Sequence, residues 1–280
     1  MKITVIIPAA GIGKRFAEAA DPLAASEKSK IELDLGGRPV FQRAIERFRH
    51  RDDVEQIVMA VDPAGFDEFK FKYGDRLGFH RVQLVKGGEK ERWQTVLNAL
   101  AAVNESSTHI AVHDAARPLT SSQLVDRVFD AAERYAAVIP ARAVHATLKK
   151  AAPLDDGEAA EKADPLDAIF GDAGRLDVKK VERTIDRRDL VEVQTPQLFE
   201  AALLRRAYEQ LEAGKVAADH ITDDASLVEA LGETVYIVDG ESINLKITLP
   251  DDMQLARAYM RTAEKKDAAS LGRKKLLDGD

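Results

Sequence analysis

The chain has 280 residues, of which 45% are hydrophobic and 32% are charged, with a formal net charge of −7 and no cysteine. The length allows one large α/β domain or two small ones, the acidic balance argues against nucleic-acid binding, and the cysteine count excludes disulfides, thiolate nucleophiles and thiolate metal sites. No apolar run is long enough for a signal-peptide core or a membrane span, so we expect a cytoplasmic protein without a membrane partner.

Short runs rich in valine and isoleucine recur along the first half of the chain, and each is apolar on both faces, as buried parallel strands require. These runs cover residues 3–8, 56–61, 81–85, 109–113 and 136–140. Amphipathic patterns between them predict helices over 40–48, 91–103 and 122–135. Because strands and helices alternate, we expect an α/β fold with a Rossmann-like, mostly parallel sheet and helices on both faces.

The regular pattern stops between about 150 and 178, where aspartate, alanine, glycine and proline dominate, and this segment is interpreted as a mobile loop or an arm. Beyond it, the sequence predicts helices over 199–213, from Thr222 and from Pro250, and strands over 234–238 and 242–248. We expect a single domain over 1–263, interrupted by an arm at about 141–187 and followed by a charged, frayed tail over 264–280.

The first strand leads into the stretch PAAGIGKRF, in which two glycines precede Lys14 and Arg15. A Rossmann dinucleotide loop would need a third glycine where Phe16 stands, and a Walker-A loop would need Lys followed by Ser or Thr after its glycine. Two interpretations remain. The loop amides could face a nucleotide with both cations against its phosphates, or the stretch could be a surface turn with a solvated Lys-Arg pair.

Three further segments place polar residues at the predicted sheet edge, where ligands bind in open parallel sheets. HDAARP follows one strand, and its Asp114 and Arg117 suit a hydroxylated, phosphorylated ligand, although a solvated loop acid next to a strand-end histidine fits as well. KGGEKERWQT places two glycines and Arg92 after another strand. Lys246 lies between two apolar residues of a late predicted strand, which constrains its direction.

Eight segments occur together in one order: PAAGIGKRF, KIELDLGGRPV, VKGGEKERWQTV, VHDAARP, ERTIDR, QTPQLF, ITDDASLVE and NLKITLPDDM. In order and approximate spacing, they resemble the 2-C-methyl-D-erythritol 4-phosphate cytidylyltransferase family, from residue 3 to about 260. The resemblance implies a nucleotidyltransferase-type fold with a protruding dimerisation arm. It also implies transfer of CMP from CTP to the polyol phosphate, release of pyrophosphate, and Mg²⁺ bound with the CTP phosphates.

The resemblance also implies a role for individual residues. Its catalytic cations match Arg15, Lys30 and Lys246. Its nucleotide-binding positions match Ala9, Ala10, Gly11, Gly13, Gly88, Thr95 and Ala115. The family's acceptor-binding positions match Asp114, Arg117, Thr147, Arg187, Thr195 and Thr222. The resemblance assigns no metal ligand among the residues of this chain. The family is a homodimer with arm exchange, so Thr147 and Arg187 would act in the partner's site.

The sequence departs from the family pattern in three places. Ala146 stands where the family usually has aspartate before the arm threonine, and the arm is longer and more acidic. An insertion over 17–29 makes Lys28 an alternative to Lys30 as the phosphate-binding lysine. A cytidylyltransferase for ribitol 5-phosphate or another polyol phosphate is therefore the alternative function. Two further alternatives rank below it: first a nucleotide-binding protein without catalysis, and last an NAD-dependent oxidoreductase.

Overall fold

The computed structural model describes residues 1–11, 13–19, 29–154 and 178–262. Contacts within the chain divide it into a main unit, Met1–Arg142 with Val193–Asp280, and an arm, Ala143–Glu192. The expected tail over 264–280, most of the insertion over 17–29 and most of the irregular segment over about 150–178 lie outside the described residues.

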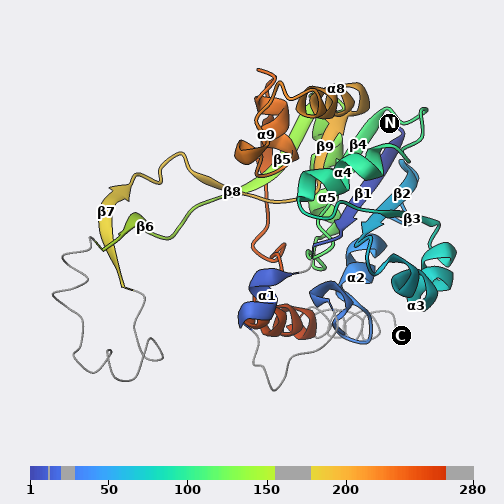
Figure 1. Cartoon of the computed structure of the whole chain (residues 1–280), viewed down its shortest axis with the longest axis horizontal. Coiled ribbons are helices and arrows are strands. Elements are labelled where there is room, and N and C mark those ends of the chain that lie inside the picture. Colours follow the sequence, from blue (N-terminus) through green and yellow to red (C-terminus); the bar gives the residue numbers. More distant parts are fainter. Residues whose placement is uncertain (12, 20–28, 155–177, 263–280) are drawn as a thin grey trace, which may run out of the picture. The chain divides into compact units, whose positions relative to one another are not determined.

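The main unit is built on a twisted sheet with the strand order β10-β5-β9-β4-β1-β2-β3 (Figure 1). The strands are β1 (Ile3–Ala9), β2 (Val54–Val61), β3 (Val82–Lys86), β4 (His109–Val112), β5 (Ala137–Ala143), β9 (Gln197–Glu200) and β10 (Tyr236–Asp239). β9 runs antiparallel to both β4 and β5, and the other pairs along this path are parallel. The predicted mostly parallel sheet is confirmed.

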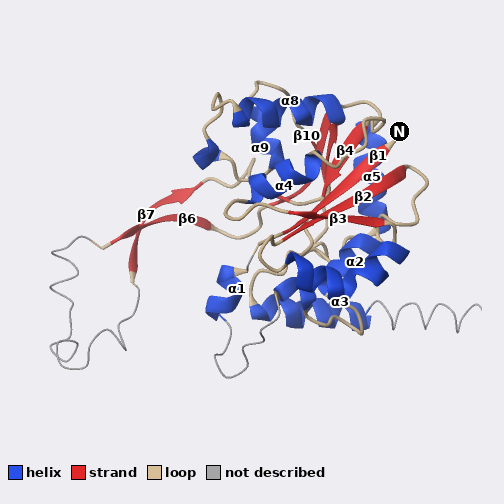
Figure 2. Cartoon of the chain, turned by 45° about the vertical axis from the view of Figure 1, so that its right-hand side comes forward, coloured by secondary structure: helices blue, strands red, loops and turns tan. Residues whose placement is uncertain are grey.

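Helices cover both faces of this sheet, as predicted (Figure 2). They are α1 (Lys14–Ala19), α2 (Val40–Glu46), α3 (Phe66–Phe79), α4 (Arg92–Leu100), α5 (Ser122–Ala132), α8 (Ala201–Glu212), α9 (Asp224–Glu229) and a helix over 250–262. Single turns of 3₁₀ helix form at η1 (Lys30–Glu32) and η3 (Ala218–His220). Within the described residues, every helix is too short or too polar to cross a bilayer.

The side chains of β1 show how one strand supplies two cores. Val5 and Ile7 pack with α2, α3 and α5 in one buried cluster, whereas Ile6 packs with α4, α8 and α9 in the other. All three side chains are fully buried. A strand that is covered on both faces needs apolar residues at consecutive positions, which is why this run shows no polar alternation.

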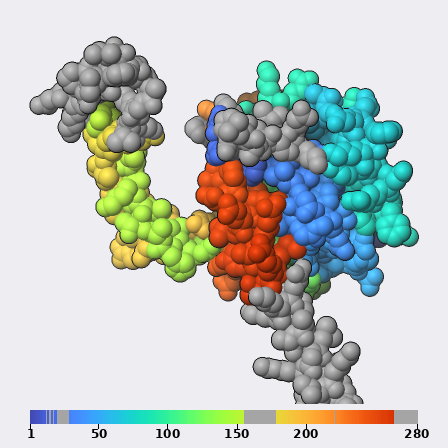
Figure 3. All heavy atoms as spheres, turned by 90° about the horizontal axis from the view of Figure 1, so that it is seen from below, coloured from blue at the N-terminus to red at the C-terminus, as the bar shows by residue number. Residues whose placement is uncertain are grey.

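A third, smaller cluster joins the helix over 250–262 to the segment around Leu35 and Val40. Figure 3 shows this helix in red and orange beside the blue early part of the chain. Ile247 is fully buried in the same cluster and donates its backbone N–H to Ala116 O at 2.8 Å. The expected strand over 242–248 is therefore wrong. The alternating apolar residues of this segment pack against a helix rather than joining the sheet.

The arm is described by itself as a two-stranded antiparallel hairpin of β6 (Leu148–Pro153) and β7 (Lys179–Ile185), and β8 (Val191–Val193) lies at its boundary. Val178 and Val181 are more than half exposed, and no described residue of the arm belongs to a buried core cluster. An isolated two-stranded hairpin is marginally stable in water.

Candidate active site

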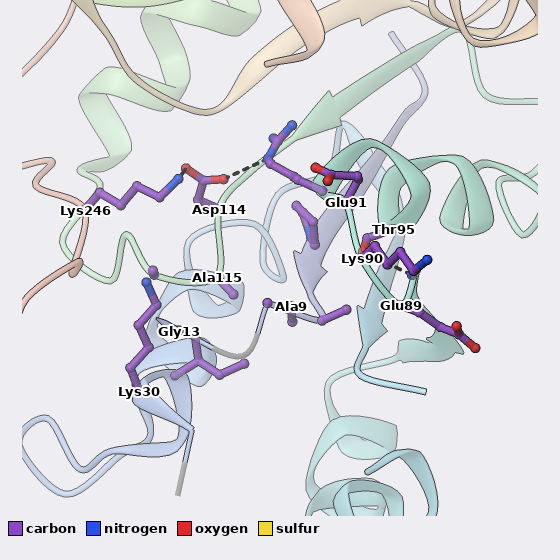
Figure 4. Close-up of a pocket in the computed structure, with 17 residues that line it drawn as sticks. Ala9, Gly13, Lys30, Glu89, Lys90, Glu91, Thr95, Asp114, Ala115 and Lys246 are labelled. Atoms are coloured by element: carbon purple, nitrogen blue, oxygen red, sulfur yellow. Dashed lines mark hydrogen bonds and ion pairs between the residues drawn. The ribbon is translucent and has the colours of Figure 1, made fainter. Parts of the chain in front are cut away.

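A cavity of about 490 Å³ lies beside the carboxyl ends of β1 and β4, and loops from several elements line it (Figure 4). Eleven of the residues singled out in the sequence line this cavity: Ala9, Ala10, Gly11, Gly13, Lys30, Gly88, Arg92, Thr95, Asp114, Ala115 and Lys246. Segments that are more than 200 residues apart in the chain thus meet at one edge of the sheet, where open α/β sheets bind their ligands.

Two glycines allow the loops around the cavity to approach closely. Gly13 has a φ of +67°, which disfavours other residues, and an added Cβ would lie 3.4 Å from the Lys30 Cδ. An added Cβ at Gly88 would lie 2.4 Å from the Gln94 Cβ and 2.9 Å from the Thr95 backbone nitrogen, so a larger residue cannot fit without movement. The Gly88 N–H donates to Thr95 Oγ1 at 3.1 Å, which ties this loop to the start of α4.

The expected phosphate-binding cations differ in what the structure shows of them. Lys30 lines the cavity, and its Nζ donates to the Ile247 carbonyl at 3.0 Å. Lys246 lines the same cavity. The side chains of Lys14 and Arg15 lie outside what the structure describes, as does Lys28, so the position of the Arg15 guanidinium remains a prediction.

Asp114 is surrounded by three cations from three parts of the chain. Its Oδ2 lies 2.8 Å from Lys246 Nζ and 3.4 Å from Arg117 Nε, and its Oδ1 lies 3.4 Å from Arg92 Nε. Burial disfavours the charge of Asp114, but Lys246, Arg92 and Arg117 more than offset it and hold the carboxyl pKa well below its usual range. Since the side chain is only 9% exposed, the alternative of a solvated loop acid is wrong.

A buried polar network supports Asp114 from behind. The Asp114 backbone N–H donates to Thr195 Oγ1 at 3.1 Å, and this hydroxyl lies 3.0 Å from His113 Nδ1. Arg117 Nη1 donates to the Asn244 carbonyl at 2.7 Å, and Asn244 Nδ2 donates to Thr195 O at 2.9 Å. Arg117 and Thr195, which were expected to bind the acceptor, do not line the cavity but support its wall, and their expected role remains a prediction.

The other expected acceptor-binding residues lie elsewhere in the chain. Thr222 is exposed just before α9, where its N–H donates to Ser226 Oγ at 3.1 Å, and it does not line the cavity. Thr147 and Arg187 belong to the arm, where both are exposed and the Arg187 guanidinium donates to the His145 carbonyl. Their expected roles remain predictions.

The chain is similar to known proteins over most of its length. The family model described as "IspD: 2-C-methyl-D-erythritol 4-phosphate cytidylyltransferase" matches residues 3–164 and 167–262. The chain belongs to this family. A family member from Rhodopirellula baltica is 35% identical over 269 residues, which cover 92% of this chain and 94% of the relative. One from Geobacillus thermodenitrificans is 35% identical over 260 residues, covering 93% and 97%.

Solved structures of family members have the same fold. The enzyme from Thermus thermophilus aligns with a TM-score of 0.65 and 31% identity, covering 93% of this chain and all of that one. The 4-diphosphocytidyl-2C-methyl-D-erythritol synthase from Anaerococcus prevotii aligns with a TM-score of 0.67 and 26% identity, covering 93% and 98%. Membership of a cytidylyltransferase family identifies the chain as a nucleotidyltransferase and contradicts the oxidoreductase alternative.

Three residues at or beside the cavity had no role assigned from the sequence: Arg92 lines the cavity, whereas Asp224 and Tyr208 lie outside its lining. Arg92 stood in a noted motif without an assigned function, although its guanidinium contacts both Asp114 and Asp224. Asp224 lay within a segment that was interpreted as an acidic helix start, and Tyr208 lay within an amphipathic helix. An aspartate in the first helical turn usually faces water, so only its burial in the folded chain reveals its different position.

The buried His113 should make the protein less stable in mild acid. Burial lowers the pKa of His113 to about 4, while the ordinary value that applies in the unfolded chain is about 6.5. Between these values the unfolded chain binds the proton more tightly, so the free energy of unfolding should fall by about 3 kcal/mol as the pH drops from 6.5 to 4.

Urea denaturation at several pH values measures this slope. His113→Gln should flatten it, whereas His145→Gln at an exposed arm position should leave it as in the wild type. An equally steep slope in His113→Gln would contradict the assignment.

Proposed function

We propose that this chain transfers CMP from CTP to 2-C-methyl-D-erythritol 4-phosphate and releases pyrophosphate, as a step toward isoprenoid precursors. The observation that carries the proposal is that one cavity, in a member of this family, joins the glycine-rich loops to Asp114, Lys30 and Lys246. The glycine-rich loops and Lys30 suit a nucleoside triphosphate, whereas Asp114 and Lys246 suit a hydroxylated phosphate. Because CTP is an intracellular nucleotide, a cytoplasmic location is part of the proposal.

The reaction needs positioning and charge stabilisation more than proton transfer. An oxygen of the acceptor phosphate attacks the α-phosphorus of CTP, a new P–O bond forms, and the bond to the β-phosphate oxygen breaks as pyrophosphate leaves. The attacking oxygen is already anionic at neutral pH, so no general base is required. The difficulty is to bring two polyanions together, and fixed cations at the α-phosphate reduce their repulsion in the transition state.

The cavity residues can divide this work between them. The backbone of Gly11 and Gly13 would receive the triphosphate, with Lys30 and Arg15 neutralising its charge. Asp114, held ionised, accepts hydrogen bonds and would receive hydroxyl groups of the acceptor. Lys246 is 37% exposed and lies next to Asp114, so it can reach an acceptor phosphate while that carboxylate holds the polyol.

We include Mg²⁺ in the proposal as an ion that enters with CTP. The described residues contain no group of three histidine, aspartate or glutamate side chains that could hold a metal ion, and Asp114 is surrounded by three cations. Triphosphate oxygens and water would therefore supply most of the oxygen ligands that the hard Mg²⁺ ion prefers. When bound, the ion would shield the phosphate charge.

We further propose a homodimer in which each arm completes the partner's site. The support comes from the arm itself, a two-stranded hairpin with exposed valines and no residue in the described core clusters. Such a hairpin gains stability by packing on a further surface. Thr147 and Arg187 would then contact the acceptor bound to the other subunit.

A pyrophosphate-release assay with CTP, Mg²⁺ and a panel of polyol phosphates tests the proposed function. The value of kcat/KM for 2-C-methyl-D-erythritol 4-phosphate should exceed that for ribitol 5-phosphate by about 100-fold or more, because unmatched buried polar groups penalise a wrong polyol. The reverse preference would identify the alternative substrate. CTP binding without turnover of any polyol would indicate a nucleotide-binding protein without catalysis.

A further inference from the structure

A line of charged and polar side chains leads from the cavity wall into the interior. It begins at Asp114, whose Oδ1 lies 3.4 Å from Arg92 Nε. Arg92 Nη1 lies 2.7 Å from Asp224 Oδ2, and the Tyr208 hydroxyl donates to Asp224 Oδ1 at 2.6 Å. Four elements therefore contribute to one connected set: the loop after β4, α4, α9 and α8.

The two inner members lie outside the cavity lining. The Asp224 side chain has no exposed surface, and Tyr208 is 2% exposed. A buried carboxylate without a partner is very unfavourable, so Arg92 is the counter-ion on which Asp224 depends. Burial raises the pKa of Tyr208 well above its ordinary value, and Asp224 adds to this shift, so the hydroxyl keeps its proton and remains a donor.

Arg92 is held more firmly than an ordinary surface arginine. Burial opposes its charge, but Asp224 and Asp114 more than compensate and raise its pKa. The planar guanidinium contacts a carboxylate on each of two sides, which fixes its orientation at the cavity edge. The other oxygen of Asp114 lies near Lys246 and Arg117. Arg92 thus restrains the Asp114 carboxylate through the oxygen that Lys246 does not contact.

We propose that Arg92, fixed by Asp224 and Tyr208, is a positioning residue that holds the Asp114 carboxylate in the orientation that receives the acceptor's hydroxyl groups. When Lys246 turns toward the acceptor phosphate, Arg92 keeps the carboxylate in place. The inference rests on the proposed function because it assigns the polyol to Asp114.

Variants of the two inner residues separate positioning from direct contact. Asp224→Asn should raise the KM for the polyol phosphate about tenfold, the size expected for losing one hydrogen bond to a charged group, and Tyr208→Phe should raise it about threefold. The KM for CTP should change less than about twofold in both variants, because neither residue touches the nucleotide side. Tyr208→Phe removes a single oxygen and keeps the test valid if Asp224→Asn does not fold.

Arg51 provides a matched control. It also bridges two aspartates, with Nη2 at 2.9 Å from Asp53 Oδ2 and Nη1 at 2.5 Å from Asp126 Oδ1, and it lies near the opposite end of β2 from the cavity. Arg51→Lys should lower the denaturation midpoint without changing either KM, whereas Arg92→Lys should raise the acceptor KM. Equal kinetic effects of the two substitutions would overturn the inference.

A double-mutant cycle and a spectroscopic measurement complete the test. In an Asp114→Asn background, Asp224→Asn should have no further effect on the acceptor KM, whereas an undiminished effect overturns the inference. In carboxyl ¹³C NMR, the Asp114 signal, identified by its loss in Asp114→Asn, should shift in Asp224→Asn even without substrate, and an unchanged signal also overturns it. If the variants are active and the acceptor KM is unchanged, only the positioning role of Arg92 is refuted. If the wild type is inactive but the Asp114 signal shifts in Asp224→Asn, only the proposed function is refuted.

Discussion

Lys246→Ala should lower the kcat for pyrophosphate release by about 100- to 1000-fold, the cost of removing one fixed stabilising charge from a polar transition state. The loss corresponds to about 3–4 kcal/mol of transition-state stabilisation. The free energy of unfolding should change little, because Asp114 keeps Arg92 and Arg117 as partners and the lysine itself is partly hydrated. Arg15→Ala should have a similar effect on kcat if its side chain reaches the same phosphates.

Lys72→Ala is the matched control for this prediction. Lys72 is 38% exposed and pairs with Glu32 at 2.8 Å, whereas Lys246 is 37% exposed and pairs with Asp114 at 2.8 Å. The two lysines thus differ mainly in whether they line the cavity. Steady-state kinetics should show normal turnover for Lys72→Ala. Normal turnover in both Lys246→Ala and Arg15→Ala would show that the reaction takes place elsewhere.

Mixing two impaired variants should restore activity if the arm acts on the partner subunit. Arg187→Ala should mainly raise the KM for the polyol phosphate, so it is nearly inactive at low acceptor concentration, and Lys246→Ala has the kcat defect described above. After subunit exchange, a heterodimer contains one site with an intact cavity and an intact arm. About a quarter of the wild-type activity should return, since half of the dimers are mixed and half of their sites are intact.

A second mixture tests the specificity of this rescue. Lys30→Ala and Lys246→Ala both alter the cavity of the main unit, so their heterodimers contain no intact cavity and should stay impaired. Analytical ultracentrifugation of labelled subunits establishes that exchange has occurred. Rescue in neither mixture after demonstrated exchange would place Arg187 in its own subunit's site or outside the site.

The sequence predicted those parts of the molecule in which local pattern and tertiary environment agree. The runs around Ile6 and Val112 are mostly apolar, without polar alternation, because both faces of the sheet are covered. The polar residues directly after these strands had to meet at one edge, so Asp114, Gly88 and the loop after β1 were correctly expected near one another.

Other parts were decided by contacts that no short window contains. α3 was not predicted because exposed Phe71 and Phe79 obscure a helical stripe that includes the buried Tyr73 and Leu77. The segment around Lys246 alternates like a strand, yet its apolar residues pack with the helix over 250–262. Asp224 has the sequence signature of an exposed helix start, and only the approach of Arg92 and Tyr208 makes it an interior anion.

The way the chain leaves and re-enters the main unit allows the length and charge of the arm to change without disturbing the sheet. The chain departs after Arg142, at the end of β5, and returns at Val193, where the Gln194 N–H immediately donates to the Pro140 carbonyl at 2.8 Å. The Gln194 side-chain amide also donates to the Glu241 carbonyl and accepts from the Glu241 backbone N–H. Hydrogen bonds thus join the departing and the returning segment at the base of the arm. Residues added farther out in the arm therefore do not alter the register of β5 or β9. Residues can therefore be added between β6 and β7, or their charge changed, while the fold of the cavity stays the same.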